Sequence, residues 1–514
     1  MRITNNIIVK NSKYNINSNK VNVDKYNTQM SSNKKISRAS EDPVVAIRAL
    51  RLTDNLSEVN QYYEKNIPDA ESWIDMTETA LINMKSIIND IYENCVNGST
   101  DTLTSTDRNA ILKNLEALKA QFYEEGNTDY AGRTVFTGYK TNSTLTFTEQ
   151  TSDYSYTITQ GSGLGTDTLT YSDIEEHTYF ANSVTVPTTP TQVGTNVPSS
   201  SVTDITDPSA MPQTVTLERI RLAYDNISNL SSLSYTYTDA DNNEQVVDLS
   251  TSVTSTNSAD FEATGYAVGD NDVIFLEDTG ELILGANVSA DIKNNRASLS
   301  VTYDKTTFEE GELRPEHYYN CTRTDSAGTV TFTRENQAIE YTVATGQTIT
   351  VNTQASDIFD SDIYRDLTEI TDAVNYAIAA EEKIAQIQSM MEQEQYSDET
   401  YQTNLKAWLA AAQKESDYAN EYMQNIFSSA IGNFSGYLND VNLGITDLGS
   451  RAQRLALTKE RVLSQQENLE DLKSSNEDRD VSDIIIDYTS AYNAYTASLQ
   501  AASKIEQTSL LNYL

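Results

Sequence analysis

The chain has 514 residues and a formal net charge of −39, from 36 basic and 75 acidic side chains. This acidic excess argues against nucleic acid as a partner, because a phosphate-binding surface needs an excess of Lys and Arg. Hydrophobic residues make up only 38% of the sequence, which favours an elongated molecule over one large globule. No apolar run reaches the length of a membrane span, and the opening residues lack an apolar core with a cleavage site, so we expect no membrane contact and no cleaved signal peptide.

The first forty residues are a weak helix candidate, because abundant Asn lowers the helix propensity. We expect this segment to be poorly ordered until a partner covers it. A second helix is predicted to begin near residue 40, with Ser40 as its cap and Pro43 in its first turn. The residues that share one face of the first segment are Ile16, Val23, Tyr26 and Met30.

A narrow apolar seam runs along the second helix, because apolar residues recur at alternating steps of four and three. Asn97 and Gly98 then turn the chain, and a further helix from Asn109 to about Glu125 completes a helical hairpin. The seam consists of Val45, Ala49, Leu52, Leu56, Val59 and Tyr63, followed after Pro68 by Ala70, Ile74, Thr77, Leu81, Met84, Ile88 and Ile91.

From about Gly138 the composition changes to Thr, Ser and Tyr with period-two alternation, which predicts strands. Three hairpins are predicted, with turns at Thr279–Gly280, Ala327–Gly328 and Thr345–Gly346. The segment "TVTLERIRLAYDNISNL" (214–230) is interpreted as a helix, because apolar residues fall on one face. The Thr, Pro and Ser-rich run 184–208 is the best linker candidate and is expected to divide the middle into two modules.

Helical patterning resumes near Ile363, breaks at about residue 475, and restarts with Asp480 and Asp483 as a cap. A seam like that of the N-terminal half returns here. Its members are Ile445, Leu448, Ala452, Leu455, Val462 and Leu469, and then Val481, Ile485, Tyr488, Tyr492, Tyr495, Leu499 and Ala502.

Such narrow seams require partner helices, which we expect from the opposite end of the chain or from neighbouring subunits. Opposite charges support pairing of the termini, since residues 1–40 carry a net +7 and residues 475–514 a net −4. We expect Lys10, Lys13 and Lys20 to face Asp483 and Asp487. Residues 141–360 carry −24 and are predicted to form a solvated exterior.

The predicted fold is therefore α+β and multidomain, with a terminal helical coiled coil or bundle built from both chain ends and β-rich domains inserted centrally. The expected division pairs residues 1–40 with 475–514 and residues 41–140 with 360–474. Two further parts are expected in the middle of the chain: a β segment with its linker (141–210) and an outer β-rich domain (211–359).

Motifs for catalysis, cofactors or metals are weak in this sequence. His177 and His317 stand in no H-E-x-x-H arrangement, and Cys95 and Cys321 match no metal or disulfide spacing. The glycines of "QGSGLGTD" (160–167) are interpreted as a flexible turn. The "DADNN" stretch (239–243) lacks the glycine and the closing Glu of a calcium loop, so a hairpin turn is favoured. We expect no enzyme activity, no cofactor and no metal.

Four sequence blocks are similar to the flagellin superfamily, and within it to the subunits of the hook-filament junction. They are "MRITNN", "MSSNKKISRASEDPVVAIRALRL", "YAGRTVFTGYKT" and the closing "TSLLNYL". Asn33 stands where the family block usually carries glycine, and this suggests a left-handed turn that Asn can adopt.

The resemblance implies a structural subunit whose terminal helices form the inner tube of the bacterial flagellum while its β domains face outward. It further implies an extracellular location, reached through the flagellar export apparatus without a cleaved signal peptide. The implied partners are further copies of the chain, another hook-associated protein, flagellin and an export chaperone.

Two alternatives stay open at this point: a filament subunit of the flagellin type, and an adhesin-like binding module carried by the central insertion. For the junction subunit, the predicted assembly interface consists of seam residues from both halves. These are Ile74, Leu81, Met84, Ile88, Leu455, Val462, Val481, Ile485, Tyr488, Tyr492, Tyr495 and Leu499.

Overall fold

The computed structural model of the chain describes residues 5–100, 103–161, 167–359 and 361–507. These residues divide into two compact units. The terminal unit comprises Met1–Glu71, Tyr341–Ile349 and Gln453–Leu514, and the central unit comprises Ser72–Glu340 and Thr350–Ala452. Both units draw on distant parts of the sequence, as the pairing of chain ends predicts.

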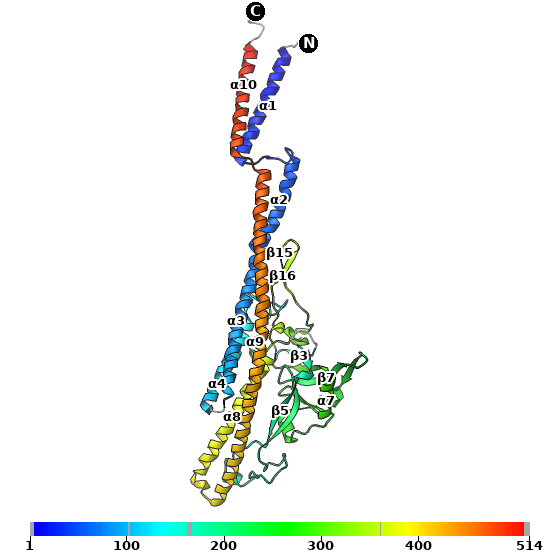
Figure 1. Cartoon of the computed structure of the whole chain (residues 1–514), viewed down its shortest axis with the longest axis vertical. Helices are drawn as coiled ribbons and strands as arrows, with labels where there is room; N and C mark the ends of the chain where they lie inside the picture. Colours follow the sequence, from blue (N-terminus) through cyan, green and yellow to red (C-terminus); the bar gives the residue numbers. More distant parts are fainter. Residues whose placement is uncertain (1–4, 101–102, 162–166, 360, 508–514) are drawn as a thin grey trace, which may run out of the picture. The chain divides into compact units, whose positions relative to one another are not determined.

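The fold is α+β, with helices at both ends of the chain and strands in the middle (Figure 1). Two helices, α3 and α9, contribute residues to both units. The helices are α1 (Asn5–Ser32), α2 (Pro43–Gln61), α3 (Ile67–Gly98), α4 (Ser105–Gly126), α5 (Pro190–Val193), α6 (Ser258–Ala263), α7 (Ala286–Asn295), α8 (Asp362–Met391), α9 (Glu399–Glu477) and α10 (Val481–Gln507).

In the terminal unit, α1 and α10 lie side by side and run antiparallel (Figure 1). The Asn19 side-chain amide donates to the Ala494 carbonyl at 3.3 Å, and Lys34 bridges to Asp478, which together fix the register. On α1, Ile16, Val23 and Tyr26 are half-buried as predicted. The placement of Met30 on that face is wrong, because Met30 is 38% exposed and the polar Gln29 takes the buried position.

The start of α2 corrects the predicted cap. Asp42, not Ser40, is the N-cap, and its carboxylate accepts hydrogen bonds from the backbone N–H groups of Val44 and Val45. Pro43 occupies the first turn, as predicted. An aspartate directly before the proline is better placed to reach the free N–H groups than a serine two residues earlier.

Between α2 and α3 the helix contains a π-helical turn, η1 (Tyr62–Asn66). The Asn66 amide donates to the Thr342 carbonyl of the hairpin formed by β15 (Glu340–Ala344) and β16 (Gln347–Thr350), at 2.7 Å. The C-terminal part of α9 packs against the same helices, with Lys459 2.7 Å from Glu71. These contacts tie the two chain ends and the hairpin into one unit.

In the central unit, α3 and α4 form the predicted antiparallel hairpin. Side-chain hydrogen bonds join Asn83 to Glu125 at 3.2 Å and Asn94 to Asn114 at 3.1 Å, so the two helices run in opposite directions. α8 packs on α4, and the resulting bundle buries apolar residues at the predicted three and four spacing.

The strands of the central unit form two main sheets. The five-stranded sheet has the order β5-β6-β11-β10-β9, and the seven-stranded sheet has the order β14-β13-β3-β12-β7-β8, with β4 also pairing β12. The strands are β1 (Asp129–Tyr130), β2 (Arg133–Thr134), β3 (Ser155–Gln160), β4 (Leu169–Thr170), β5 (Ile174–Ala181), β6 (Gln213–Arg221), β7 (Ser228–Thr238), β8 (Glu244–Asp248), β9 (Val253–Thr256), β10 (Val273–Leu276), β11 (Glu281–Leu284), β12 (Ser298–Lys305), β13 (Asn320–Asp325) and β14 (Gly328–Phe332).

The prediction of a helix over 214–230 is wrong, because this segment forms β6, a turn and the start of β7. β6 pairs on one side with β5 and on the other with β11, and Asn226 turns the chain with φ of 48°. Apolar residues spaced for a helix face also suit alternate positions of a strand, and pairing on both sides decides between the two.

The prediction that residues 184–208 divide the middle into two modules is also wrong. β5 precedes this run and β6 follows it, yet the two strands pair along their length. The run itself is packed, since Val184 and Val193 are buried against the α8–α9 hairpin and the Trp408 indole donates to the Val193 carbonyl at 3.3 Å. Buried valines inside a Thr and Pro-rich stretch explain why composition alone misassigned it.

The three predicted hairpins are confirmed as β10–β11, β13–β14 and β15–β16. The "DADNN" stretch forms the turn between β7 and β8, also as predicted. Most of the "QGSGLGTD" stretch (162–166) and the closing "TSLLNYL" lie outside the described residues.

Candidate assembly interface and buried charge network

The twelve predicted interface residues fall into three groups by exposure. Six are buried within the single chain, Tyr488 and Tyr495 are half-buried on α10, and the remaining four are 43–52% exposed on α10. The buried residues already pack within the chain, whereas the exposed ones are free to meet another molecule. The buried six are Ile74, Leu81, Met84, Ile88, Leu455 and Val462, and the exposed four are Val481, Ile485, Tyr492 and Leu499.

Apolar side chains are exposed at further positions of the α1–α10 pair. α10 turns Ile484 inward, fully buried, and leaves Ile486 65% exposed, while α1 exposes Tyr14 (74%) and Val21 (66%). A two-helix pair cannot bury an apolar face that lies on its outside. Apolar side chains on the outside of a long helix pair are typical of a surface that other helices cover.

A polar joint closes the α1–α10 pair where the two helices meet the rest of the terminal unit. Asn33 adopts the predicted left-handed conformation, with φ of 55°, and its carbonyl accepts from the Arg479 N–H at 3.0 Å. The Lys34 ammonium lies 2.6 Å from Asp478 and 3.0 Å from Glu477. The hydrogen bond that Lys34 donates to the Asp478 carboxylate raises the pKa of Lys34, and it lowers the pKa of Asp478.

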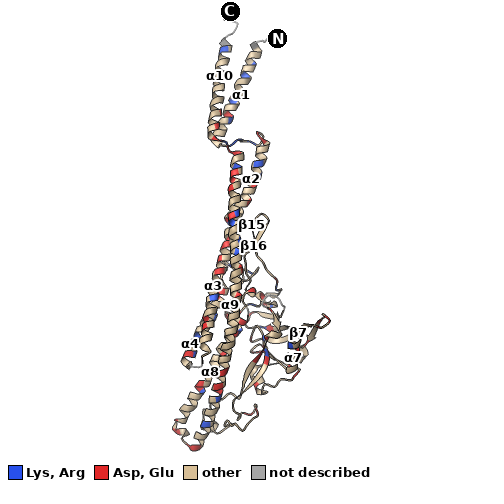
Figure 2. Cartoon of the chain, in the orientation of Figure 1, with Lys and Arg blue, Asp and Glu red and all other residues tan. Residues whose placement is uncertain are grey.

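The predicted partners of the basic α1 residues are wrong in register. Because α1 and α10 are antiparallel, with Asn19 beside Ala494, the lysines at 10, 13 and 20 lie beyond the level of Asp483 and Asp487. Asp487 instead pairs with Arg479 of its own segment, and Lys34 makes the contact across the pair. Figure 2 marks the basic and acidic side chains of both helices.

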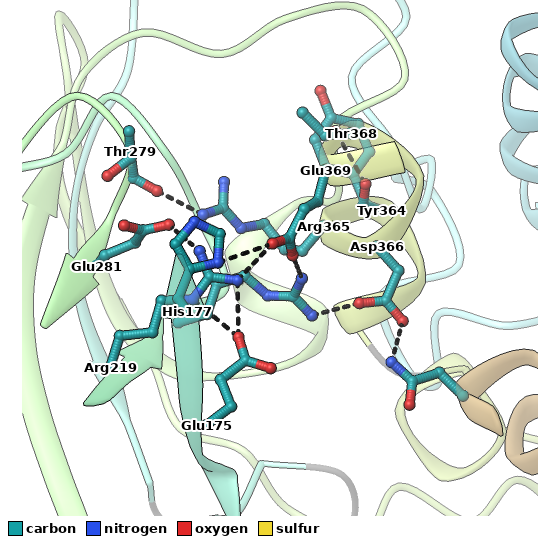
Figure 3. A network of polar contacts seen from close by, with 12 residues as sticks. Glu175, His177, Arg219, Thr279, Glu281, Tyr364, Arg365, Asp366, Thr368 and Glu369 are labelled. Carbon is teal, nitrogen blue, oxygen red and sulfur yellow. Dashed lines mark hydrogen bonds and ion pairs between the residues drawn. The ribbon is translucent and has the colours of Figure 1, made fainter. Parts of the chain in front are cut away.

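A buried charge network joins the five-stranded sheet to α8 within the central unit (Figure 3). Arg219 of β6 is 3% exposed and pairs with Glu175 at 2.7 Å, with Glu369 at 2.6 Å and with Glu281. Arg221, two residues on, pairs with Glu369 at 2.7 Å and with Asp366. Residues two apart on a strand point to the same face, so β6 presents both guanidinium groups to α8.

The Glu369 carboxylate of this network is held ionised by its partners. Burial alone would raise the pKa of Glu369, but Arg219, His177 and Arg221 hold it well below its usual range. His177 lies 3.3 Å from Glu369, and Asp366 also accepts from Asn433 and Tyr437 at 2.9 Å each. Groups on the strands and on α9 therefore donate hydrogen bonds to the carboxylates of Glu369 and Asp366 on α8.

A cavity of about 300 Å³ opens beside the network, lined by groups that include Arg219, Glu281, Arg365 and Tyr422. Within its lining, Arg219 pairs with Glu281, and Arg365 donates a hydrogen bond to the Thr279 carbonyl. This arrangement suits a structural joint between sheet and helix.

Sequence reasoning missed the network, although a signal was present. Glu175 and His177 alternate along one strand and Arg219 and Arg221 along another, which places charged residues on one face of each. Charged residues at alternate strand positions indicate either solvent or a paired partner, and only the β5–β6 register, with Glu175 opposite Arg219, decides between them.

Both cysteines are free and buried in the described structure. Burial raises the pKa of Cys95 to about 12, and it raises that of Cys321 as well, so both thiols stay protonated. Across the residues that the structure describes, no group of three or more His, Cys, Asp or Glu side chains is placed to hold a metal ion. Within the same residues, none of the helices combines the length and apolar character needed to cross a bilayer.

Comparison with known proteins gives matches to flagellar proteins. Residues 3–141 match the family model described as the bacterial flagellin N-terminal helical region. Flagellar hook-associated protein 3 of Escherichia coli (strain K12) is 31% identical over 131 residues, which is 25% of this chain and 41% of that protein. Flagellin of Clostridium tyrobutyricum is 30% identical over 128 residues, or 25% of this chain and 34% of that protein.

The chain thus spans less than half the length of the curated relatives it matches. Among solved structures, a putative flagellar hook-associated protein from Vibrio parahaemolyticus aligns with 85% of this chain and 100% of its own, at 12% identity and a TM-score of 0.34. The flagellar junction protein FlgL from Legionella pneumophila aligns with 85% of this chain and 100% of its own, at 11% identity and a TM-score of 0.28.

Proposed function

We propose that this chain, whose residues 3–141 match the bacterial flagellin N-terminal helical region, is a structural subunit of the bacterial flagellum at the hook-filament junction. The single observation that carries the assembly role is the exposed apolar face of the α1–α10 pair, whose α10 residues Val481, Ile485, Tyr492 and Leu499 are 43–52% exposed. A stable extracellular subunit with such a face is suited to packing against copies of itself.

In this role the chain acts by binding and positioning, not by catalysis. The partners we propose are further copies of the chain, another hook-associated protein and flagellin, with a chaperone during export. The terminal helices would make the contacts between subunits, and the acidic central strands would face solvent. The relatives named hook-associated protein 3 support the junction over the filament, and flagellin remains the nearest competitor.

Localisation tests this proposal directly. Antibody or tag labelling of intact flagella, viewed by electron microscopy, is expected to mark one short zone between hook and filament. Label along the whole filament would instead identify a filament subunit. A strain that lacks the gene should keep its hooks and lose its filaments, because flagellin would then have no junction on which to assemble.

A further inference from the structure

An amine and two carboxylates meet inside the central unit, at the end of β12, and the assembly role does not use them. Lys305 is the last residue of β12, and its side chain is only 1% exposed. Its Nζ lies 3.0 Å from Oε1 of Glu312 and 3.6 Å from Oδ1 of Asp225. Nζ also donates a 2.6 Å hydrogen bond to the Asp225 backbone carbonyl, which holds that residue beside the amine.

The surroundings of this cluster are aromatic. The rings of Tyr224 and Phe308 lie 5.6 Å and 5.3 Å from Nζ, and Phe308 stacks on Phe147 at 4.5 Å. Burial raises the pKa of Glu312 above its usual value, despite the neighbouring Lys305. Charges are costly in such a site, which favours the uncharged form of the Glu312 carboxyl group.

The Asp225 carboxyl group receives donors on both of its oxygens. Arg365 Nη1 lies 3.4 Å from Oδ2, and the Asn226 amide donates to Oδ1 at 3.3 Å. Donors on both oxygens withdraw electron density from Cγ and would stabilise the negative charge of a tetrahedral intermediate. Asp225 is therefore the carboxyl group prepared to act as an electrophile, while Glu312, in hydrogen-bonding distance of the amine, is prepared to carry a proton.

We propose that Lys305 and Asp225 form an intramolecular amide bond, with Glu312 carrying protons between them. The Glu312 carboxylate takes a proton from the Lys305 ammonium and passes it to the Asp225 carboxylate as the free amine attacks Cγ. Glu312 then removes a proton from the new C–N centre and delivers it to the departing hydroxyl, so that a C–O bond breaks and one water leaves. Lysine ammonium and aspartate carboxylate become one neutral amide, Glu312 is regenerated, and no oxidant or cofactor is needed.

The fixed positions of the Lys305 amine and the Asp225 carboxyl group favour this condensation over a simple ion pair. Groups held near attack distance react with effective molarities of about 10⁵ M and above, and the burial of Lys305 and Glu312 limits the access of water to the amine. The bond joins the loop between β6 and β7 to the end of β12, two sites that lie 80 positions apart in sequence. A covalent link of that span restricts the unfolded chain strongly, as a disulfide does.

Mass spectrometry of the purified full-length chain, denatured before measurement, tests the proposal. The protein is expected to be lighter than its sequence mass by one water. After trypsin digestion the peptides 222–293 and 297–323 should remain joined, since an acylated Lys305 is not cleaved. An unmodified mass would overturn the proposal, and a link from Lys305 to Glu312 in place of Asp225 would overturn the assignment of the electrophile.

Two variants separate chemistry from folding. Glu312→Gln keeps the size of the side chain and both reacting groups but cannot carry the proton, so bond formation is expected to slow by about 10²–10⁴-fold. Glu310→Gln removes an exposed carboxylate from the same loop and should leave the bond intact. Full water loss in Glu312→Gln at the wild-type rate would show that Glu312 has no part in the reaction. None of these outcomes depends on where the protein is located.

Discussion

The α1–α10 pair exposes apolar side chains, whereas the central unit buries charged ones. On α10, Val481, Ile485 and Tyr492 are about half exposed, whereas in the central unit Arg219 and Arg365 are no more than 6% exposed. The helix pair thus leaves apolar surface outside, and the central unit brings charge inside and pairs it.

This difference indicates where each region obtains its stability. The central unit draws stability from within the chain, because Arg219 and Arg221 pair with buried carboxylates and its apolar residues fill a core. The helix pair has an apolar face that the described residues leave exposed, so its full stability is expected only on assembly. Substitutions in the central unit should therefore lower the free energy of unfolding, whereas substitutions on the exposed face of the helix pair should impair self-assembly.

The largest effect on folding is expected from Arg219→Met. The change leaves Glu175, Glu281 and Glu369 together without their shared cation, and breaking a buried charge network from one side costs about 3–5 kcal/mol. Chemical denaturation of the full chain, followed by Tyr and Trp fluorescence, measures this loss.

Lys293→Gln is the matched control for that variant. Lys293 pairs with Glu218 of the same strand β6, but both side chains are about one-third exposed, so the loss is expected to be about 0–1 kcal/mol. Equal losses in the two variants would show that the network contributes no more than a surface ion pair.

The second effect depends on pH and on His317. Burial lowers the pKa of His317 to about 4, from an ordinary value near 6.5, while its Nε2 lies 3.1 Å from both the Ser143 hydroxyl and the Thr144 carbonyl. The neutral ring is preferred in the folded state, so its stabilisation is complete above pH 6.5 and is lost as the pH falls towards 4. The loss over that window is on the order of 2–3 kcal/mol.

His317→Gln removes the titrating ring and keeps a hydrogen-bonding side chain. Denaturation curves measured between pH 7 and pH 4 give the free energy of unfolding at each pH. In the variant this free energy should fall less steeply as the pH is lowered. An unchanged slope would mean that the carboxylates, such as Glu369 with its lowered pKa, account for the acid sensitivity instead.

A smaller effect is expected at the joint of the terminal unit. Asn33→Ala places a β-carbon without a polar side chain at φ of 55°, which costs about 1 kcal/mol, whereas Asn33→Gly should be tolerated. Hydrogen exchange of α1 and α10 should rise in the alanine variant alone. Equal exchange in the two variants would show that this turn does not order the helix pair.

The contrast between the two regions also explains what the sequence could predict. The hairpin of α3 and α4 and the turn at Gly280 follow from local signals, namely periodicity and turn residues, whereas the left-handed Asn33 follows from the resemblance to a block that usually carries glycine; the structure confirms all three. These features depend on residues close together in sequence, where propensity and spacing act directly.

The buried network could not be predicted in the same way. It depends on the pairing of β5 with β6 and on the approach of α8, which brings Glu369 to Arg219 across 150 positions. The same long-range pairing turned the expected helix at 214–230 into strands. On α10 the spacing identified an apolar seam, but the antiparallel register with α1 decided that Ile484 points inward and Ile485 outward.

The most direct test of the contrast replaces the exposed apolar residues of α10, Val481, Ile485, Tyr492 and Leu499, with Gln in the full chain. Because these side chains are exposed in the single chain, unfolding of the monomer should change by less than about 0.5 kcal/mol per site. Self-assembly, followed by sedimentation and light scattering, should be lost. Assembly at the wild-type level, or collapse of the folded monomer, would contradict the assignment of this face to contacts between subunits.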